Sequence, residues 1–294
     1  MGTILITGAN GHLGKAVTES LLRKMEVKDL AVMVRDESKA GQFKARGVSV
    51  RVADYENYEA LILAFQGVEK LYLVSGTDLE RRTAQHKNVI DAAQAAGIKQ
   101  IVYTSYQRKN ETSNSPIAIV SEAHLETEKM LKASGLIYTI MQHTLYSEII
   151  PDFAGPQLLQ TKTIYLPAEN GKTAFASRSD LADAEANILV DPSEKYYNKS
   201  IEMTGSEQIS WSDIAAMLTE ITGDQINYIP AKVDEYRDVL TKAGVPDVFV
   251  GMLIGFNQAI AQGEFEAVTT DLEELLGRKP QSVRAYLAET FGKK

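Results

Sequence analysis

The residues best suited to chemistry in this sequence begin with three glycines near its amino terminus. Gly8, Gly11 and Gly14 directly follow an apolar run, Thr3–Thr7, and open a segment with a helical pattern. In a strand–turn–helix setting the first glycine permits a tight turn and the second lets the backbone approach a pyrophosphate. The third allows close packing of the helix on the strand. The alternative is a purely structural turn.

We therefore predict a dinucleotide-binding loop at this point. Backbone N–H groups at the start of a helix face a bound phosphate, and the helix dipole favours the negative charge. The position of the glycines directly after a first strand strengthens a pattern that is weak by itself. The residues expected to contact the cofactor here are Thr7, Gly8, Asn10, Gly11, His12, Leu13 and Gly14.

The choice of nucleotide depends on the end of the second predicted strand. Arg35 stands where an acid would hold a ribose 2′-hydroxyl, and a guanidinium suits a 2′-phosphate by bidentate pairing. This predicts NADP(H), unless Arg35 is only a solvated arginine at a strand end. The neighbouring Asp36 could serve NAD(H), which stays possible, although a helix cap ahead of Ser38 suits Asp36 better.

Polar or small residues also end the next three predicted strands. Asp54 follows the third strand, where it could reach an adenine or cap a helix with equal ease. Ser75 and Gly76 end the fourth strand, and Thr104 and Ser105 end the fifth. Ligands bind at the carboxyl edge of such sheets. We therefore expect these residues to contact the ribose and nicotinamide groups.

Short apolar runs alternate with helical patterns through the first half of the chain. The predicted strands are Thr3–Thr7, Leu30–Val34, Val48–Val52, Lys70–Val74, Gln100–Thr104 and Ile137–Met141. The predicted helices are Gly14–Met25, Ser38–Arg46, Tyr58–Phe65, Glu80–Ala96 and Ser121–Ala133. Continuous apolar strands separated by helices are typical of a parallel sheet covered on both faces, so the fold class is α/β, a doubly wound parallel Rossmann sheet.

The alternation fades after about residue 142. Residues 143–170 look irregular, and two short β segments, Thr173–Phe175 and Ser200–Met203, flank a helix that starts at Asp180. Helices dominate from residue 210 on: Ser210–Thr222, Asp234–Ala243, Val248–Gln262 and Thr270–Leu276. We predict a Rossmann domain over residues 1–142. Residues 143–294 form a smaller, mostly helical substrate lobe with segments that return to the sheet.

Composition excludes several classes of site. The chain has no cysteine, and its four histidines show no metal-binding spacing, so no metal site is expected. The net charge of −8 disfavours a nucleic-acid surface. No stretch approaches the roughly 18–20 apolar residues of a membrane span, and no signal peptide is evident. We expect a cytoplasmic protein with no membrane and no nucleic-acid partner.

Ordered motifs along the whole chain resemble one family. They are Gly8–Gly14, Val34-Arg35, Gly67–Leu71, Gln85-His86-x-Asn88-Val89-Ile90-x-Ala92-Ala93, Tyr103-Thr104-Ser105, His124-Leu125-Glu126-Thr127-Glu128 and Gly263-Glu264 through Thr270–Leu272 to Leu276-Gly277. The chain resembles the NmrA-like atypical short-chain dehydrogenases, especially the branch of bacterial NADPH:quinone oxidoreductases and triphenylmethane reductases. The resemblance implies an NADPH-dependent reductase of a quinone or a similar flat conjugated electrophile, of the triarylmethane-dye type.

The chain departs from ordinary short-chain dehydrogenases in one respect. The resemblance aligns Val120 with their catalytic tyrosine and His124 with their lysine. Valine cannot transfer a proton, which disfavours a ketone or sugar-nucleotide dehydrogenase. Quinones and triarylmethyl cations need little general-acid help, so orientation of cofactor and substrate can carry the reaction. A non-catalytic, NADP(H)-sensing regulatory protein is the alternative.

The resemblance also implies a substrate pocket. His124 would hold a nicotinamide-ribose hydroxyl, unless it pairs with Glu128 one turn later. His143, Tyr146 and Glu148 follow the sixth strand, where the family's substrate cleft is expected, and Tyr106 could lean over the substrate. We therefore assign catalytic roles to His124, Tyr106 and Tyr146 and substrate contacts to Tyr106, His143, Tyr146 and Glu148. The chain could be a monomer or a homodimer.

Overall fold

The computed structural model describes residues 2–292, which fall into two compact units. Unit 1 comprises the residues up to Tyr106, Ile119–His143 and Arg178–Glu202. Unit 2 comprises Gln107–Ala118, Thr144–Ser177 and the residues from Met203 on. The expected boundary lay at residue 142. In the structure unit 1 also includes Arg178–Glu202, and unit 2 includes Gln107–Ala118, which lies before the expected boundary.

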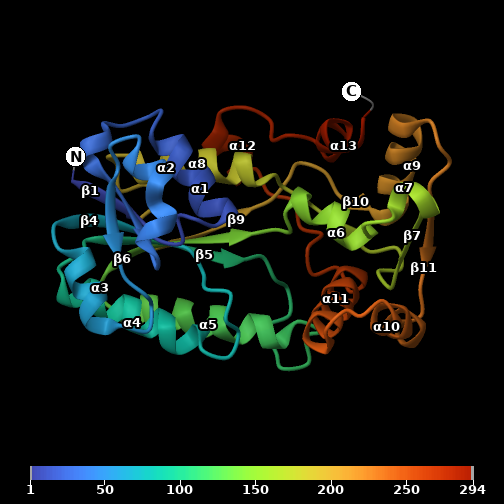
Figure 1. Cartoon of the computed structure of the whole chain (residues 1–294), viewed down its shortest axis with the longest axis horizontal. Coiled ribbons are helices and arrows are strands. Elements are labelled where there is room, and N and C mark those ends of the chain that lie inside the picture. The colour runs from blue at the N-terminus through green and yellow to red at the C-terminus, as the bar shows by residue number, and fades with distance from the viewer. Residues whose placement is uncertain (1, 293–294) are drawn as a thin grey trace. The chain divides into compact units, whose positions relative to one another are not determined.

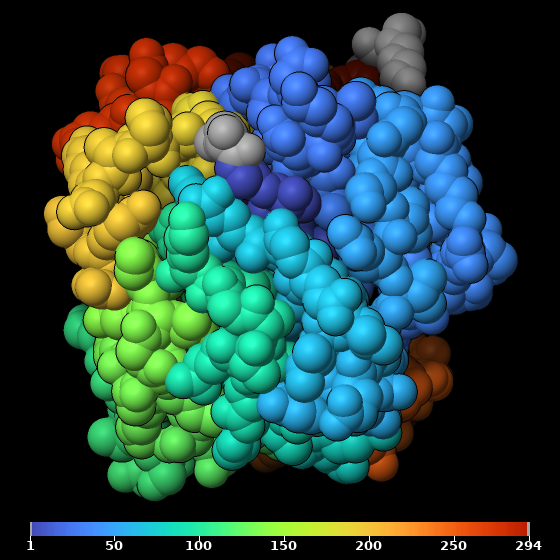
Figure 2. Space-filling model, turned by 90° about the vertical axis from the view of Figure 1, so that its left-hand side faces the viewer, coloured from blue at the N-terminus to red at the C-terminus, as the bar shows by residue number. Residues whose placement is uncertain are grey.

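Unit 1 is built on a seven-stranded sheet in the order β3-β2-β1-β4-β5-β6-β9 (Figure 1). The strands β1 to β6 pair in parallel, which confirms the predicted doubly wound fold. Their bounds are β1 (Thr3–Ile6), β2 (Leu30–Val34), β3 (Ser49–Val52), β4 (Val68–Leu73), β5 (Gln100–Tyr106), β6 (Ile137–His143) and β9 (Lys199–Met203). Figure 2 views unit 1 from the end at which the strands begin. The colours cross it in the order of the sheet, from light blue through dark blue and cyan to green and yellow.

Helices cover both faces of this sheet (Figure 1). On one face α1 (His12–Leu21) packs against α8 (Arg178–Val190). On the other face lie α3 (Tyr58–Phe65), α4 (Arg82–Ala95) and α5 (Ala118–Ala133). The short elements of unit 1 are η1 (Val27–Asp29), η2 (Glu37–Ala40) and α2 (Gly41–Lys44).

The pleat of the strands decides which side chains meet which helices. Successive side chains of a strand point to opposite faces. Leu71, Tyr103 and Ile140 belong to the apolar core shared with α3, α4 and α5. Tyr72 and His143, each an odd number of residues away on the same strands, therefore face the α8 side. This alternation separates two groups of buried polar residues in unit 1.

Unit 2 is mostly helical, as predicted, with two small sheets. Its helices are η3 (Ser147–Ile149), α6 (Ile150–Ala154), α7 (Leu158–Thr161), α9 (Trp211–Thr222), α10 (Val233–Lys242), α11 (Asp247–Ala261), α12 (Asp271–Leu276) and α13 (Val283–Phe291). Strand β7 (Thr163–Leu166) pairs with β11 (Asn227–Pro230), and β8 (Lys172–Thr173) pairs with β10 (Ile209–Ser210).

The region 143–170 is more regular than expected. Pro151 lies in the first turn of α6, where its missing N–H costs nothing, so this proline starts a helix and does not interrupt one. The α9 helix begins with a complete capping box between Ser210 and Asp213. Helix α13 was not predicted. Within residues 2–292 no helix is long and apolar enough to cross a membrane, and no acidic or histidine group is arranged to hold a metal ion.

Candidate active site

The glycine loop has the geometry that a bound diphosphate requires. Gly8 has a φ of 58°, a conformation that disfavours a side chain. A Cβ on Gly14 would lie 2.4 Å from the Gly8 carbonyl oxygen, so only glycine allows this close approach of helix and strand. Gly11 begins α1 without any side-chain cap, which leaves the first-turn N–H groups available to an anion. These features fit a dinucleotide.

A cavity of about 320 Å³ lies in unit 1 beside this loop. It brings together residues from the ends of the first four strands, including six of the predicted cofactor contacts: Gly8, Gly11, Arg35, Asp54, Ser75 and Gly76. The other lining residues are Met33, Val34, Ala53, Tyr55, Glu56, Val74, Thr77, Asp78, Arg81 and Gln85. The cavity is lined entirely by unit 1.

Arg35 and Asp36, at the end of β2, play different parts. Arg35 is exposed at the cavity, and within residues 2–292 no carboxylate pairs with its guanidinium. The Asp36 carboxylate accepts hydrogen bonds from the Ser38 backbone N–H at 2.9 Å and the Ser38 hydroxyl at 2.6 Å. These bonds lower the pKa of Asp36, and they confirm its predicted role as a helix cap. Arg35 is thus available to a phosphate, whereas Asp36 is occupied.

Tyr55, which the sequence did not single out, ties the first and fourth strands together at the cavity. Its hydroxyl lies 2.5 Å from the Thr7 Oγ1 atom and 2.9 Å from the Val74 carbonyl oxygen. Burial raises the pKa of Tyr55 above its ordinary value. Thr7 is fully buried, donates to the Tyr72 carbonyl and accepts from the Val74 N–H. The side chain of Thr7 therefore holds strands together in this structure.

Asp54 and the cavity rim form polar turns. The Asp54 carboxylate accepts from the Glu56 N–H at 3.0 Å, so this residue both lines the cavity and stabilises the turn before α3. On the rim, Arg81 lies 2.6 Å from Glu56 and 2.6 Å from Asp78. Gln85 donates to Glu56 at 3.1 Å. The rim thereby joins the loops that follow β3 and β4.

The loop after β4 presents a hydroxyl that lacks a partner. The Ser75 N–H donates to Thr104 Oγ1 at 2.8 Å, which joins the ends of β4 and β5. The Ser75 hydroxyl is buried at the cavity, and none of the described residues hydrogen-bonds to it. Buried polar groups are rarely left unpaired, so this hydroxyl fits contact with a ligand such as a ribose.

His86, on α4, is hydrogen-bonded to the loop that follows β4. The Gly76 N–H donates to His86 Nε2 at 3.0 Å, and Thr127 donates its own hydroxyl hydrogen to the Ala123 carbonyl. The 2.8 Å contact between His86 Nδ1 and Thr127 Oγ1 must therefore be donated by Nδ1. The ring is neutral, in agreement with burial and the Arg82 charge, which lower the pKa of His86 to about 3.

Beside it, His124 lies between a cation and a phenol. Arg82 Nη1 is 3.3 Å from His124 Nε2, and the Tyr103 hydroxyl is 2.7 Å from His124 Nδ1. Because arginine can only donate, Nε2 accepts and Nδ1 carries the hydrogen that goes to Tyr103. Burial raises the pKa of Tyr103, so it stays a neutral phenol. The ring of His124 is 7% exposed and is oriented by these two contacts.

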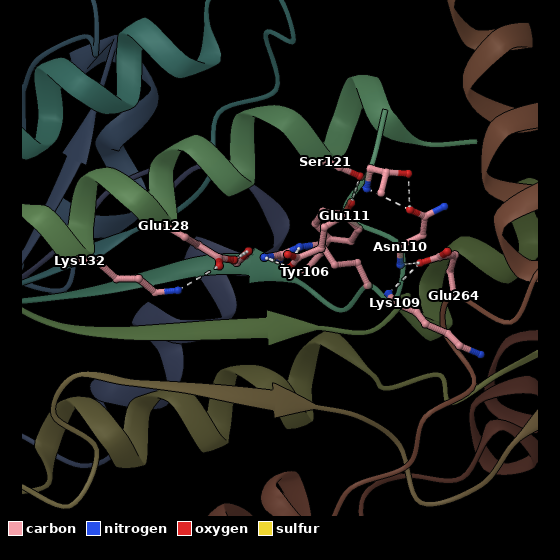
Figure 3. Close-up of polar contacts among 11 residues, drawn as sticks. Tyr106, Lys109, Asn110, Glu111, Ser121, Glu128, Lys132 and Glu264 are labelled. Carbon is pink, nitrogen blue, oxygen red and sulfur yellow. Dashed lines mark hydrogen bonds and ion pairs between the residues drawn. The ribbon is translucent and has the colours of Figure 1, made fainter. Parts of the chain in front are cut away.

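Tyr106 completes the site at the end of β5. Its hydroxyl is hydrogen-bonded to that of Ser121, in α5 (Figure 3). Its ring meets the edge of His124 at 5.0 Å between centroids. The predicted alternative partner of His124, Glu128, instead accepts from the Ser105 hydroxyl at 2.6 Å and lies 3.9 Å from Lys132.

His143 lies on the opposite face of the sheet from this cluster. Its Nε2 atom is 2.5 Å from a Glu185 carboxylate oxygen, on α8, and the other oxygen accepts from the Tyr72 hydroxyl at 2.5 Å. His143 is 2% exposed and Glu185 is fully buried. Because His143 is an odd number of residues from Ile140 along β6, the pleat turns it to the α8 side. The expected substrate contact thus lies in the interior of unit 1.

The remaining predicted residues are dispersed. Tyr146 and Glu148 belong to unit 2, where Tyr146 forms a bridge with Ala176. In the glycine loop, Asn10 and His12 are exposed and Leu13 is buried. Asn10 accepts a hydrogen bond from Gln42 at 3.4 Å.

Sequence reasoning missed several residues that the fold brings to this site: Tyr55, Arg82, His86, Tyr103, Ser121 and Thr127. Tyr103 and Thr127 stood inside motifs of the family resemblance but carried no assigned role. His86 was considered only as part of a dimer surface by analogy, whereas the structure buries it completely. The polar spacing of α5 placed Ser121, His124 and Thr127 on one side of a helix, which is a signal that could have grouped them.

Known proteins agree with this architecture. The sequence pattern of the NmrA-like family matches residues 1–287 of this chain. Quinone oxidoreductase 2 of Escherichia coli is 35% identical over 288 residues, 98% of each chain. A crystal structure of the E. coli NADPH-dependent quinone oxidoreductase in complex with NADPH is 34% identical, with a TM-score of 0.92. The match covers 99% of this chain and all of that one.

A second solved structure is similar to the same extent. The triphenylmethane reductase of Citrobacter sp., in complex with NADP(H), has a TM-score of 0.91 and 30% identity, over 98% of this chain and 99% of its own. Both the family match and these relatives extend over nearly the whole sequence. The chain therefore belongs to the NmrA-like family and is an NAD(P)H-dependent oxidoreductase.

Proposed function

We propose that this chain transfers a hydride from NADPH to a quinone or a similar flat, conjugated electrophile. One observation carries the proposal. The carboxyl edge of the sheet in unit 1 combines a cavity suited to a dinucleotide with a polar cluster around Tyr106 and His124. His124 lies on α5, the helix in which the family resemblance aligns Val120 with the proton-donating tyrosine. The relatives named as quinone oxidoreductase and triphenylmethane reductase support the same class of acceptor.

The cofactor is NADP(H), and the residues of the cavity fit it. The turn of Gly8 and Gly11 would hold the diphosphate, Arg35 the 2′-phosphate and Ser75 a ribose hydroxyl. When bound, the nicotinamide supplies a hydride. Asp36 is occupied as a cap, which favours NADPH over NADH.

The chain's own residues orient the acceptor and supply hydrogen bonds. The hydroxyls of Tyr106 and Ser121 form one pair, from which a hydrogen bond can be given to an acceptor oxygen. His124 supports the Tyr106 ring and is held in turn by Arg82 and Tyr103. Tyr146 and Glu148 stay predicted substrate contacts. His143 is left out of the proposal, since its ring contacts Glu185.

The test is consumption of reduced nicotinamide by purified protein. NADPH and NADH are each followed by absorbance with and without a simple benzoquinone, and with a no-protein control because quinones oxidise NADPH slowly unaided. We expect protein-dependent consumption that is faster with NADPH. Tight binding of NADPH without turnover of any quinone or dye would contradict the proposal and favour a sensing role.

The assignment of Arg35 has its own test. Arg35→Ala should raise the dissociation constant for NADPH by about 10–100-fold, the loss of a charge-assisted bidentate contact, and leave that for NADH nearly unchanged. Arg46→Ala is the matched control, since Arg46 is an exposed arginine paired with Glu19. Equal losses for both nucleotides in Arg35→Ala would remove Arg35 from the 2′-phosphate site.

A further inference from the structure

Arg82 is a buried cation that the fold leaves without a counter-ion. It is the first residue of α4 and is 7% exposed. Among residues 2–292, no carboxylate lies within ion-pair distance of its guanidinium, and its Nε atom is buried with no hydrogen-bond partner. Burial of an unpaired charge costs several kcal/mol, and such groups are normally paired. Arginine stays protonated even when buried.

Asp78, whose charge acts on Arg82, and Glu128, on α5, are already engaged elsewhere. Asp78 pairs with Arg81 on the rim, and Glu128 holds Ser105 and Lys132. The partner of Arg82 is instead the neutral ring of His124, whose Nε2 accepts from it at 3.3 Å. His124 gives its other hydrogen to Tyr103, so it orients the guanidinium and is not itself placed to release a proton.

The neighbours of Arg82 are the proposed catalytic groups. Tyr106 packs its ring edge-on to His124. The Tyr106 hydroxyl is hydrogen-bonded to that of Ser121, in α5 (Figure 3). A positive charge kept at this edge, with one donor unsatisfied, is suited to an anion that arrives or forms with the ligand.

We propose that Arg82 stabilises the negative charge that forms on the acceptor, so that the chain prefers neutral acceptors that become anions. This inference rests on the proposed function. The C4–H bond of the nicotinamide breaks and its two electrons leave with the hydrogen. An O–H bond forms at one quinone oxygen, and the opposite oxygen becomes a phenolate. NADPH is oxidised to NADP⁺, and the hydroquinone monoanion takes one proton from solvent.

A triarylmethyl cation behaves differently with the same hydride. The new C–H bond forms at the central carbon and the product is neutral, so no anion appears for Arg82 to stabilise. The positive charge of Arg82 would instead repel the cationic dye. Arg82 should therefore separate the two acceptor types by charge, which a purely structural arginine would not do.

The experiment compares Arg82→Met with the wild-type protein on a benzoquinone and on malachite green. The ratio of kcat/KM for quinone to that for dye should fall at least 100-fold in Arg82→Met, with Arg82→Lys in between. The dissociation constant for NADPH, from nicotinamide fluorescence, should change less than 3-fold. Lys87→Met is the control, because Lys87 is an exposed cation of the same helix, paired with Asp91.

Three results would overturn the inference. An equal loss on both acceptors would mean that Arg82 only maintains the site. A rise of more than 10-fold in the NADPH dissociation constant would assign Arg82 to the cofactor phosphates. A lower melting temperature of Arg82→Met, where we expect an unchanged or higher one, would make the residue structural.

A binding measurement keeps the inference separate from the proposed function. If neither acceptor is reduced, the proposed function fails, and titration of the cofactor-free protein with 4-nitrophenolate still tests the anion site by calorimetry. Binding that is lost in Arg82→Met but kept in Lys87→Met supports the site. Equal binding by all three proteins, or none by the wild type, contradicts it.

Discussion

Two buried polar clusters lie on opposite faces of the same sheet in unit 1, and they are built differently. The α8 cluster consists of Tyr72, His143 and Glu185, in which one carboxylate accepts two hydrogen bonds of 2.5 Å. The α4–α5 cluster consists of Arg82, His86, Tyr103, His124 and Thr127, which contains a cation but no acid.

The hydrogen-bond pairing within each cluster separates buried polar residues that stabilise the fold from those suited to a ligand. The α8 cluster places an acid beside its hydrogen-bond donors, so it can be stable without a ligand. The α4–α5 cluster leaves a guanidinium N–H unsatisfied and lies next to the orphan Ser75 hydroxyl through His86 and Gly76. Incomplete pairing at the carboxyl edge of the sheet therefore indicates a ligand site.

Removal of the acid from the α8 cluster should have the largest effect on stability. Glu185→Ala should lower the free energy of unfolding by about 3–5 kcal/mol, because two buried donors lose their acceptor. Urea denaturation measures the change, and Glu126→Ala, which breaks an exposed pair with Lys129, serves as the control. A loss of catalytic rate in the folded Glu185→Ala protein would assign the α8 cluster to the active site and contradict its purely structural role.

Acidic pH should lower the stability of the folded protein through His86, a member of the α4–α5 cluster. The folded pKa of about 3 lies below the ordinary value of 6.5, so between these pH values the unfolded chain binds the extra proton. Stability is complete above pH 6.5 and falls by about 1.4 kcal/mol per pH unit as the pH drops toward 3. His86→Gln should remove this part of the slope, measured by denaturation at several pH values, whereas the exposed His12→Gln should keep it. Parallel slopes in all three proteins would show that His86 is charged in the folded state.

A smaller loss of stability is expected on substitution of Thr127, the hydrogen-bond partner of His86. Thr127→Val keeps the shape of the side chain but leaves the His86 Nδ1–H buried without an acceptor, at a cost of about 1–2 kcal/mol. Thermal unfolding measures the change, with the exposed Thr290→Val as control. An unchanged melting temperature would mean that the ring hydrogen of His86 is on Nε2 and not on Nδ1.

The smallest change in stability is expected at Arg82. Arg82→Met should change the free energy of unfolding by less than about 1 kcal/mol or raise it, since the substitution removes a buried charge that lacks a counter-ion. Urea denaturation of this variant beside Glu185→Ala compares the two clusters directly. Losses of equal size would show that both clusters are structural.

Local patterns predicted much of the fold. The strand Leu30–Val34 and the helix Tyr58–Phe65 have the predicted bounds, because an all-apolar run and a cap at Asn57 are signals contained in a few residues. The region 143–170 was predicted less well. Its helices are only about one turn long, so no period could be read from them.

The candidate site divides in the same way. The glycine loop, Arg35 and the cap at Asp36 were predicted, since each depends on neighbours within a few residues. His143 was grouped with the substrate pocket because it follows the sixth strand, yet the direction of its side chain depends on the pleat of that strand. Arg82 was not assigned a role because its partner, His124, is 42 positions away.

The sequence by itself determined the parallel sheet and the glycine loop, because steric limits and turn chemistry act over short segments, and it predicted Arg35 as the contact for a 2′-phosphate. Only the tertiary structure decided which buried polar residues meet. Strand order brings α4 beside α5, and the pleat sends Tyr103 to their face and Tyr72 to α8. Whether a buried charge finds a partner depends on this long-range packing, and that is why the unpaired Arg82 became visible only in three dimensions.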